Sequence, residues 1–262
     1  MRKTSGVADR GMLSLWFAYP DDLYPQQTID ACALLLSDDE RIRWQSFRFD
    51  RDRRQYLATR VLVRTALSHR VQISPQSLRF SSNPWGKPAI HPDTSVRFNL
   101  SNCPALVTCL ITDQAEVGVD AEPLERAPEI ARLGPHVFSP EEQLQLDALP
   151  DLQKPGRALT LWTLKESWIK ARGMGLSIPL NRVSFLFSDS GTDVRLEVDE
   201  QFRDETARNW RYCLLDHAGH RIALMIDSSG APRLERWELH PLLSPPVRVP
   251  GGGEVWYPPT RD

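Results

Sequence analysis

The sequence has few of the residues that hold metal clusters, disulfide networks or membrane anchors. Its 262 residues include four cysteines and six histidines, and neither set shows a C-x-x-C, H-x-x-x-H or H-E-x-x-H pattern. Zinc sites and disulfide frameworks need tighter spacing than this. We therefore expect four reduced, mostly buried thiols, at Cys32, Cys103, Cys109 and Cys213.

Long apolar runs and an excess charge are also lacking. No segment reaches the roughly 18 apolar residues that a membrane span needs, and the start of the chain has no signal-peptide core. The formal net charge is −2, so nothing global favours nucleic-acid binding. We predict a cytoplasmic protein with no membrane or nucleic-acid partner.

The order of local patterns indicates an α+β protein in two halves. Apolar alternation predicts strands over 12–19, 78–80, 96–100, 105–112, 116–122, 182–187, 194–198, 212–215, 222–226 and 234–239. Capping signals and helical spacing predict helices over 26–36, from Ser37, over 50–69, from Ser139 and over 155–172. We divide the chain into an N-terminal α/β subdomain (1–115), a C-terminal one (116–243) and a loosely ordered tail (244–262).

A first constellation of chemically capable residues lies in the predicted strand 116–122. Asp120 and Glu122 are two positions apart, so their side chains project from the same face of the strand. Two neighbouring carboxylates repel each other unless a cation or proton lies between them, and Mg²⁺ prefers such oxygen ligands. A solvated, acidic strand end explains the same letters.

A second constellation lies in the predicted helix 155–172. Glu166 and Lys170 are four positions apart and share a helix face, and Gly173 and Gly175 follow directly. An ordinary surface ion pair is the simple alternative, but glycines next to a charged face let the backbone approach a ligand closely.

Together the two stretches resemble a known paired signature. The segment Gly118-Val119-Asp120-x-Glu122, followed about forty residues later by Trp162-x-x-Lys165-Glu166-Ser167-x-x-Lys170-x-x-Gly173-x-Gly175-Leu176, resembles the surfactin-type 4'-phosphopantetheinyl transferases. The segments Gly86-Lys87-Pro88, Phe98-Asn99-Leu100-Ser101 and Phe138-Ser139 resemble further segments of that family.

The resemblance implies a fold of two similar α/β subdomains with coenzyme A bound in the cleft between them. It implies Asp120, Glu122 and Glu166 as Mg²⁺ ligands and Asp120, Glu166 and Lys170 as the catalytic residues. The residues that it implies near coenzyme A are Lys87, Ser101, Lys165 and Lys170.

One position departs from the family pattern. The family usually has a histidine that helps to hold the 3'-phosphate of coenzyme A where this chain has Asn102, which carries no charge. An arginine-rich stretch over 41–60 could compensate, since guanidinium forks match phosphate oxygens. Within it, Arg43 and Arg54 align best with basic positions of the family, although a solvated helix face explains such arginines equally well.

The implied reaction transfers the 4'-phosphopantetheine arm of coenzyme A to a serine of an apo carrier protein and releases 3',5'-ADP, with Mg²⁺ as cofactor. The general base is Glu166 or a metal-bound water. We expect coenzyme A and acyl or peptidyl carrier domains as partners, and a monomer. Two other readings remain open at this point: a Mg²⁺-dependent nucleotide phosphohydrolase with water as acceptor, and a non-catalytic phosphate- or partner-binding protein.

Overall fold

The computed structural model describes residues 12–113, 115–175, 179–188, 194–199, 208–240, 242–251 and 255–257. Its α-helices are α1 (Gln26–Ala33), α2 (Asp38–Ser46), α3 (Asp50–Val71), α4 (Ala127–Ala131), α5 (Pro140–Asp147) and α6 (Lys154–Arg172). Its strands are β1 (Met12–Ala18), β2 (Arg79–Ser82), β3 (Pro88–His91), β4 (Val96–Cys103), β5 (Leu106–Asp113), β6 (Val117–Pro123), β7 (Val183–Phe187), β8 (Val194–Val198), β9 (Trp210–His217), β10 (His220–Asp227), β11 (Arg233–Leu239) and β12 (Val247–Val249). Among these helices, none is both long and apolar enough to cross a lipid bilayer.

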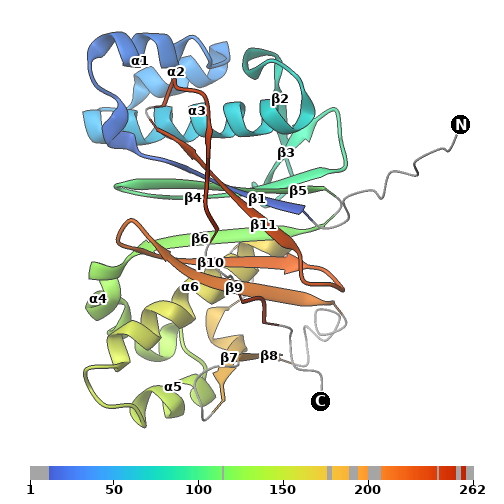
Figure 1. Ribbon diagram of the computed structural model, residues 1–262. Coiled ribbons are helices and arrows are strands. Elements are labelled where there is room, and N and C mark those ends of the chain that lie inside the picture. Colours follow the sequence, from blue (N-terminus) through green and yellow to red (C-terminus); the bar gives the residue numbers. More distant parts are fainter. Residues whose placement is uncertain are drawn as a thin grey trace, which may run out of the picture.

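The first sheet has the strand order β12-β11-β1-β5-β4. Alternation along β1 gives it two buried faces, because successive side chains point to opposite sides. Trp16 and Ala18 belong to the core under α1–α3, whereas Leu13, Leu15 and Phe17 belong to a core on the other face. A helix layer therefore covers one face of this sheet only (Figure 1).

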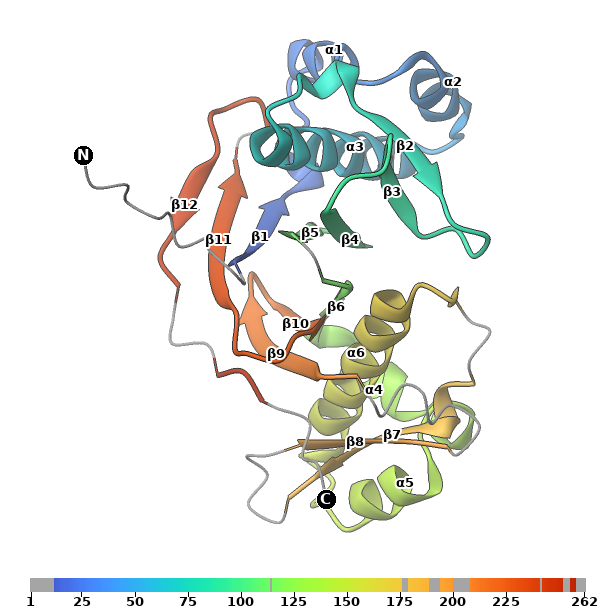
Figure 2. The same ribbon diagram turned by 90° about the vertical axis from the view of Figure 1, so that its right-hand side faces the viewer.

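The second sheet has the order β6-β10-β9 and lies against that free face. Val119 and Ala121 of β6 and Leu224 of β10 pack into the core shared by the two sheets, while Ala223 and Met225 face α6. The layers thus run from α1–α3 through the two sheets to α4 and α6, and the hairpin of β7 and β8 lies between α6 and α5 (Figures 1 and 2).

The chain crosses between the halves more often than our division at residues 115 and 243 implies. Strand β11, which we placed in the C-terminal subdomain, pairs in parallel with β1 of the first sheet. The segment that we expected to be a loosely ordered tail continues the exchange, because β12 pairs with β11. Tyr257 then exchanges backbone hydrogen bonds with Tyr212 of β9 and stacks on its ring.

The chain returns to the first sheet because β1 has an edge along which β11 pairs in parallel. The apolar alternation in the sequence identifies β11 as a strand but does not say which strand it pairs with. Trp237 of β11 stacks on Trp16 of β1 with ring centroids 5.3 Å apart, so burial of these aromatic surfaces favours that partner.

Candidate active site

Glycine at position 118 allows β6 and α6 to approach closely. A Cβ atom there would lie 1.9 Å from the backbone oxygen of Ser167 and 2.5 Å from the backbone nitrogen of Ala171. No side chain fits at such distances. Because side chains alternate, Gly118, Asp120 and Glu122 lie on the same face of β6, and this close packing brings both carboxylates beside α6.

The open edge of β6 is closed by two side chains of β4, the edge strand of the first sheet. Asn99 Oδ1 accepts a hydrogen bond from the backbone N–H of Val119 at 2.9 Å. Ser101 Oγ accepts one from the N–H of Ala121 at 3.1 Å. The F-N-x-S segment therefore joins the two halves of the molecule directly beside Asp120.

A cavity of about 430 Å³ opens at this junction. Its walls come from the end of β4, from β6, from the turn Leu124–Arg126 and from α6, so it lies between the two halves of the chain. The lining residues with polar side chains are Ser101, Asn102, Cys103, Asp120, Glu122, Arg126, Trp162, Glu166 and Lys170.

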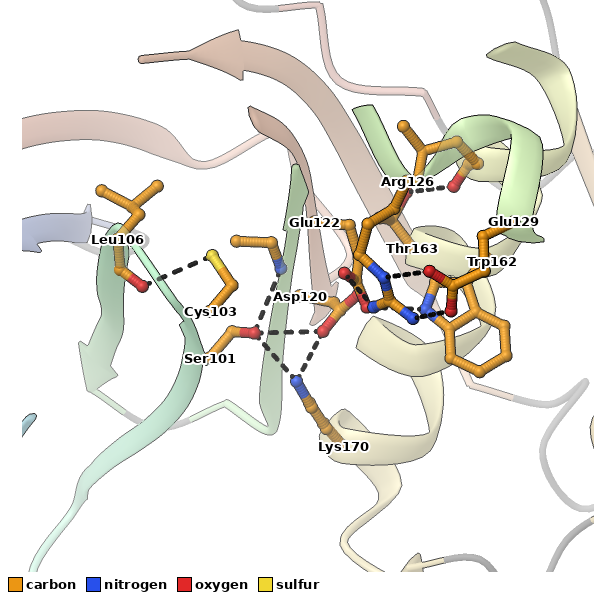
Figure 3. A network of polar contacts seen from close by, with 12 residues as sticks. Ser101, Cys103, Leu106, Asp120, Glu122, Arg126, Glu129, Trp162, Thr163 and Lys170 are labelled. Atoms are coloured by element: carbon orange, nitrogen blue, oxygen red, sulfur yellow. Dashed lines mark hydrogen bonds and ion pairs between the residues drawn. The ribbon is translucent and has the colours of Figure 1, made fainter. Parts of the chain in front are cut away.

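Asp120 and Lys170 form the centre of the polar network in the cavity (Figure 3). Lys170 Nζ donates to Asp120 Oδ1 at 2.6 Å and to Ser101 Oγ at 3.1 Å. The Ser101 hydroxyl in turn donates to Asp120 Oδ1 at 3.1 Å. The buried second oxygen of Asp120, Oδ2, accepts no hydrogen bond from the described residues.

Glu122 is held by two donors. Trp162 Nε1 donates to Glu122 Oε1 at 2.9 Å, and Arg126 Nη1 donates to Glu122 Oε2 at 2.6 Å. Arg126 also donates to both carboxylate oxygens of Glu129, at 2.9 and 3.4 Å (Figure 3). The carboxylate of Glu122 is thus oriented by an indole from α6 and a guanidinium from the turn before α4.

Glu166 completes the group from the neighbouring turn of α6. Burial raises the pKa of its carboxyl, and the negative charges of Asp120 and Glu122 raise it further, while Lys170 lowers it. In the described part of the chain, no group donates a hydrogen bond to Glu166. Glu166 is therefore a carboxylate whose ionised form is poorly stabilised, which favours the capture of a proton or a cation.

Cys103 also lines the cavity but is not suited to nucleophilic chemistry. Burial raises the pKa of its thiol to about 12, and Glu122 contributes in the same direction. The group is protonated at neutral pH, and the thiol form is a poor nucleophile. Cys103 is therefore not suited to form a covalent intermediate.

Lys165, which the family resemblance implied near the diphosphate, lies elsewhere. Its side chain is fully buried, pairs with Glu142 Oε2 at 2.5 Å and donates to the carbonyls of Val137, Leu180 and Val183 at 2.6–2.9 Å. It is absent from the cavity wall. Lys165 thus joins α6 to the start of α5 and to β7 rather than facing a ligand.

Lys87 is likewise used inside the fold. Its ammonium donates to the carbonyls of Ala171 and Val117 and to Glu116, at 2.7, 3.3 and 2.6 Å. Gly173 has φ +70° and a Cβ there would lie 2.6 Å from the Lys87 side chain. The close approach that we expected of this glycine is thus to the Gly86-Lys87-Pro88 turn, which holds the end of α6.

The remaining predicted coenzyme-binding residues fall into two groups. Ser101 and Asn102 line the cavity, and Asn102 is exposed there. Arg43 and Arg54 are absent from its wall: Arg43 is exposed on α2, and Arg54 lies over the ring of Tyr24 at 4.7 Å in a separate cavity. The structure therefore assembles Asp120, Glu122, Glu166, Lys170, Ser101 and Asn102, and leaves out Arg43, Arg54, Lys87 and Lys165.

The fit of a divalent cation depends on the donors and on their present partners. Carboxylate oxygens are the ligands that Mg²⁺ prefers, and the unpaired Asp120 Oδ2 and the raised pKa of Glu166 both indicate uncompensated negative charge. However, no three acidic, histidine or cysteine side chains among the described residues are arranged as a metal site. Lys170 forms an ion pair with Asp120, and Arg126 forms one with Glu122. A divalent cation would therefore compete with both ion pairs.

Two models of protein families match the chain. The model of the N-terminal part of 4'-phosphopantetheinyl transferases matches residues 25–112, and that of the 4'-phosphopantetheinyl transferase superfamily matches residues 116–225. The chain belongs to the 4'-phosphopantetheinyl transferase superfamily. The family prediction and the α+β fold class predicted from the sequence are confirmed.

Two named relatives and one solved structure are similar to parts of this chain. The chain is 31% identical over 156 residues to the 4'-phosphopantetheinyl transferase HetI of Nostoc sp. (strain PCC 7120), a match that covers 58% of this chain and 66% of HetI, just under two thirds. It is 28% identical over 179 residues to the transferase Sfp of Bacillus subtilis (strain 168), covering 68% of this chain and 79% of Sfp. The crystal structure of Helicobacter pylori holo-(acyl-carrier-protein) synthase in complex with coenzyme A aligns with 43% of this chain and 99% of its own, with 17% identity and a TM-score of 0.36.

The roles of two residues in this cavity were missed in the sequence analysis. Trp162 was noted only as part of the signature, whereas in the structure its indole N–H donates a hydrogen bond to Glu122. Arg126 gave no signal, because it lies six residues after Asp120 in a turn outside any regular period. An arginine four positions after a candidate metal ligand is the only local hint.

Proposed function

We propose that this protein transfers the 4'-phosphopantetheine arm of coenzyme A to a serine hydroxyl of an apo carrier protein and releases 3',5'-ADP. The observation that carries the proposal is the cavity between the two halves, in which Asp120, Glu122, Glu166 and Lys170 converge in a chain of this family. The cytoplasmic location, the monomeric state and the Mg²⁺ requirement belong to the same proposal.

Asp120, Glu122 and Glu166 would hold the Mg²⁺ ion. When bound, such an ion neutralises negative charge that develops on the phosphate oxygens. The cavity wall carries these three carboxylates against two cationic side chains, Arg126 and Lys170. Without a bound cation, this excess of carboxylates over cationic side chains would repel a diphosphate.

The chain's own residues supply the remaining steps. Lys170 reaches into the cavity from α6 and would place its ammonium beside the leaving phosphate. Glu166 lines the same cavity and would be placed to accept the proton of the serine hydroxyl. Ser101 orients both Asp120 and Lys170 through its hydroxyl.

The deciding experiment combines the purified protein, coenzyme A, Mg²⁺ and a panel of apo carrier domains, followed by intact-mass measurement of each carrier. A carrier that gains one phosphopantetheine arm, only with Mg²⁺ present, is the expected result. Release of 3',5'-ADP in the absence of any carrier would instead indicate a phosphohydrolase. Coenzyme A binding with neither transfer nor release would indicate a binding protein.

A further inference from the structure

Arg126 is one of two cationic side chains in the cavity wall, and both of its present partners are carboxylates. It is the last residue of a short 3₁₀ turn, Leu124–Arg126, which leads from the end of β6 into α4. The guanidinium of Arg126 therefore reaches the cavity from a turn, whereas the ammonium of Lys170 reaches it from α6 (Figure 3).

The two partners of Arg126 differ in how firmly they can hold it. Glu129 is 63% exposed, and an ion pair at such a site contributes little stability because water screens it. Glu122 is nearly buried and its second oxygen is bound by the indole of Trp162. The contact with Glu122 therefore decides where the guanidinium lies.

A cation on Glu122 would change that contact. The oxygen that Arg126 binds, Oε2, is one that Glu122 would offer to a divalent ion, so the two positive charges compete for it. Once displaced, the guanidinium would still be carried beside the cavity by the turn Leu124–Arg126, with the exposed Glu129 as its remaining partner. A planar fork of N–H donors in that position matches the oxygens of a phosphate group.

Among the described residues that line the cavity, Lys170 is the other cation, and we assign it above to the leaving phosphate. Asn102, on the β4 side of the same cavity, has no charge, and Arg43 and Arg54 are absent from the wall. Lys170 is engaged with Asp120 and Ser101. We propose that Arg126 neutralises Glu122 while no metal is bound and, when a divalent cation occupies Glu122, binds a phosphate group of coenzyme A. This inference rests on the proposed function.

The test is Arg126→Gln, with Arg132→Gln as the matched control, because Arg132 is an exposed arginine at the end of α4 that is absent from the cavity wall. Calorimetric titration of coenzyme A in Mg²⁺ should show affinity reduced about 10- to 100-fold in Arg126→Gln, the usual value of a lost charge-assisted contact. Arg126→Lys keeps the charge but loses the fork, so its affinity for coenzyme A should lie between those of the wild type and Arg126→Gln.

Metal binding should change in the opposite direction. Mn²⁺ titration of the free protein, followed by electron paramagnetic resonance, should show tighter binding to Arg126→Gln, because a competing cation is gone. A purely structural role of Arg126 would weaken both ligands together. Weaker Mn²⁺ binding, or coenzyme A affinity within about threefold of the wild type, overturns the inference.

Coenzyme A without its 3'-phosphate identifies the phosphate group. A penalty from Arg126→Gln that persists with this analogue assigns the contact to the diphosphate, and a penalty that disappears assigns it to the 3'-phosphate. Failure of the proposed function gives a different result, since the wild-type protein would then leave every carrier unmodified, whatever Arg126→Gln does to the affinity for coenzyme A.

Discussion

Helix α6 carries two ionic clusters that use the same residue types for different ends. The sealed cluster is Lys165 with Glu142, and the open cluster is Asp120, Glu122, Glu166, Lys170 and Arg126. Lys165 and Lys170 are five residues apart, which is about 140° around a helix, so they face different surroundings.

The difference between the clusters is how completely their hydrogen-bonding groups are used. In the sealed cluster, Lys165 has a carboxylate and three carbonyls as acceptors, and Glu142 also accepts from the backbone N–H groups of Ser139 and Phe185. In the open cluster, Asp120 Oδ2 and Glu166 lack donors among the described residues. Charged groups whose hydrogen-bonding capacity is fully used stabilise a fold, whereas charged groups at a cavity that lack partners are available for a ligand.

Glu166→Gln should have the largest effect on function. We expect transfer to a carrier to fall about 100-fold or more, because one oxygen ligand and the candidate base are lost together. The free energy of unfolding should not fall, since the substitution removes a carboxylate that Asp120 and Glu122 repel. Intact-mass assays and urea denaturation measure the two quantities, with the exposed Glu141→Gln as control. Transfer within about threefold of wild type would refute a role for Glu166.

Lys165→Met should have the largest effect on stability. It leaves Glu142 buried without its charge partner, which costs about 3–5 kcal/mol of unfolding free energy. The double variant Lys165→Met with Glu142→Leu should recover much of this loss, because an apolar pair of similar size is tolerated. Loss of transfer by folded Lys165→Met, without loss of stability, would show that the sealed cluster belongs to the site.

Lys170→Ala should lower stability in a way that Mg²⁺ reverses, which distinguishes the open cluster from the sealed cluster. Removal of the ammonium leaves Asp120 buried and unpaired, which should lower the unfolding free energy by about 1–3 kcal/mol in EDTA. Mg²⁺ should restore stability but not turnover, while Lys165→Met should show no such rescue. Thermal unfolding with and without Mg²⁺ distinguishes the two lysines, and equal behaviour would contradict the comparison.

Cys103→Ala should have the smallest effect, although its thiol lines the open cavity. An acid whose pKa is raised in the folded state stabilises the fold below its ordinary pKa. For the Cys103 thiol, this contribution to the unfolding free energy is lost only as the pH rises from its ordinary pKa toward its pKa in the folded protein, about 12. The rate profile between about pH 6 and 9 should therefore be the same in variant and wild type. A limb that disappears in the variant would show that a thiolate participates.

Several elements could be predicted from local patterns alone. The capping boxes at Ser37 and Ser139 both form, the first opening α2 and the second opening α5. Gly173 ends α6 with a left-handed backbone. These features depend on residues within one or two turns of each other, so neighbouring letters are sufficient.

The sequence by itself determined most of the strand and helix order, without β3, α4 and β12, together with the family and the two segments that carry the acidic residues and Lys170. Only the tertiary structure decided which lysine faces the cavity, that Arg126 enters it, and that β11 returns to the first sheet. A pattern of letters specifies which side of its own element a residue occupies. What lies against that side depends on contacts between residues tens to hundreds of positions apart, such as Trp16 with Trp237 and Glu122 with Trp162.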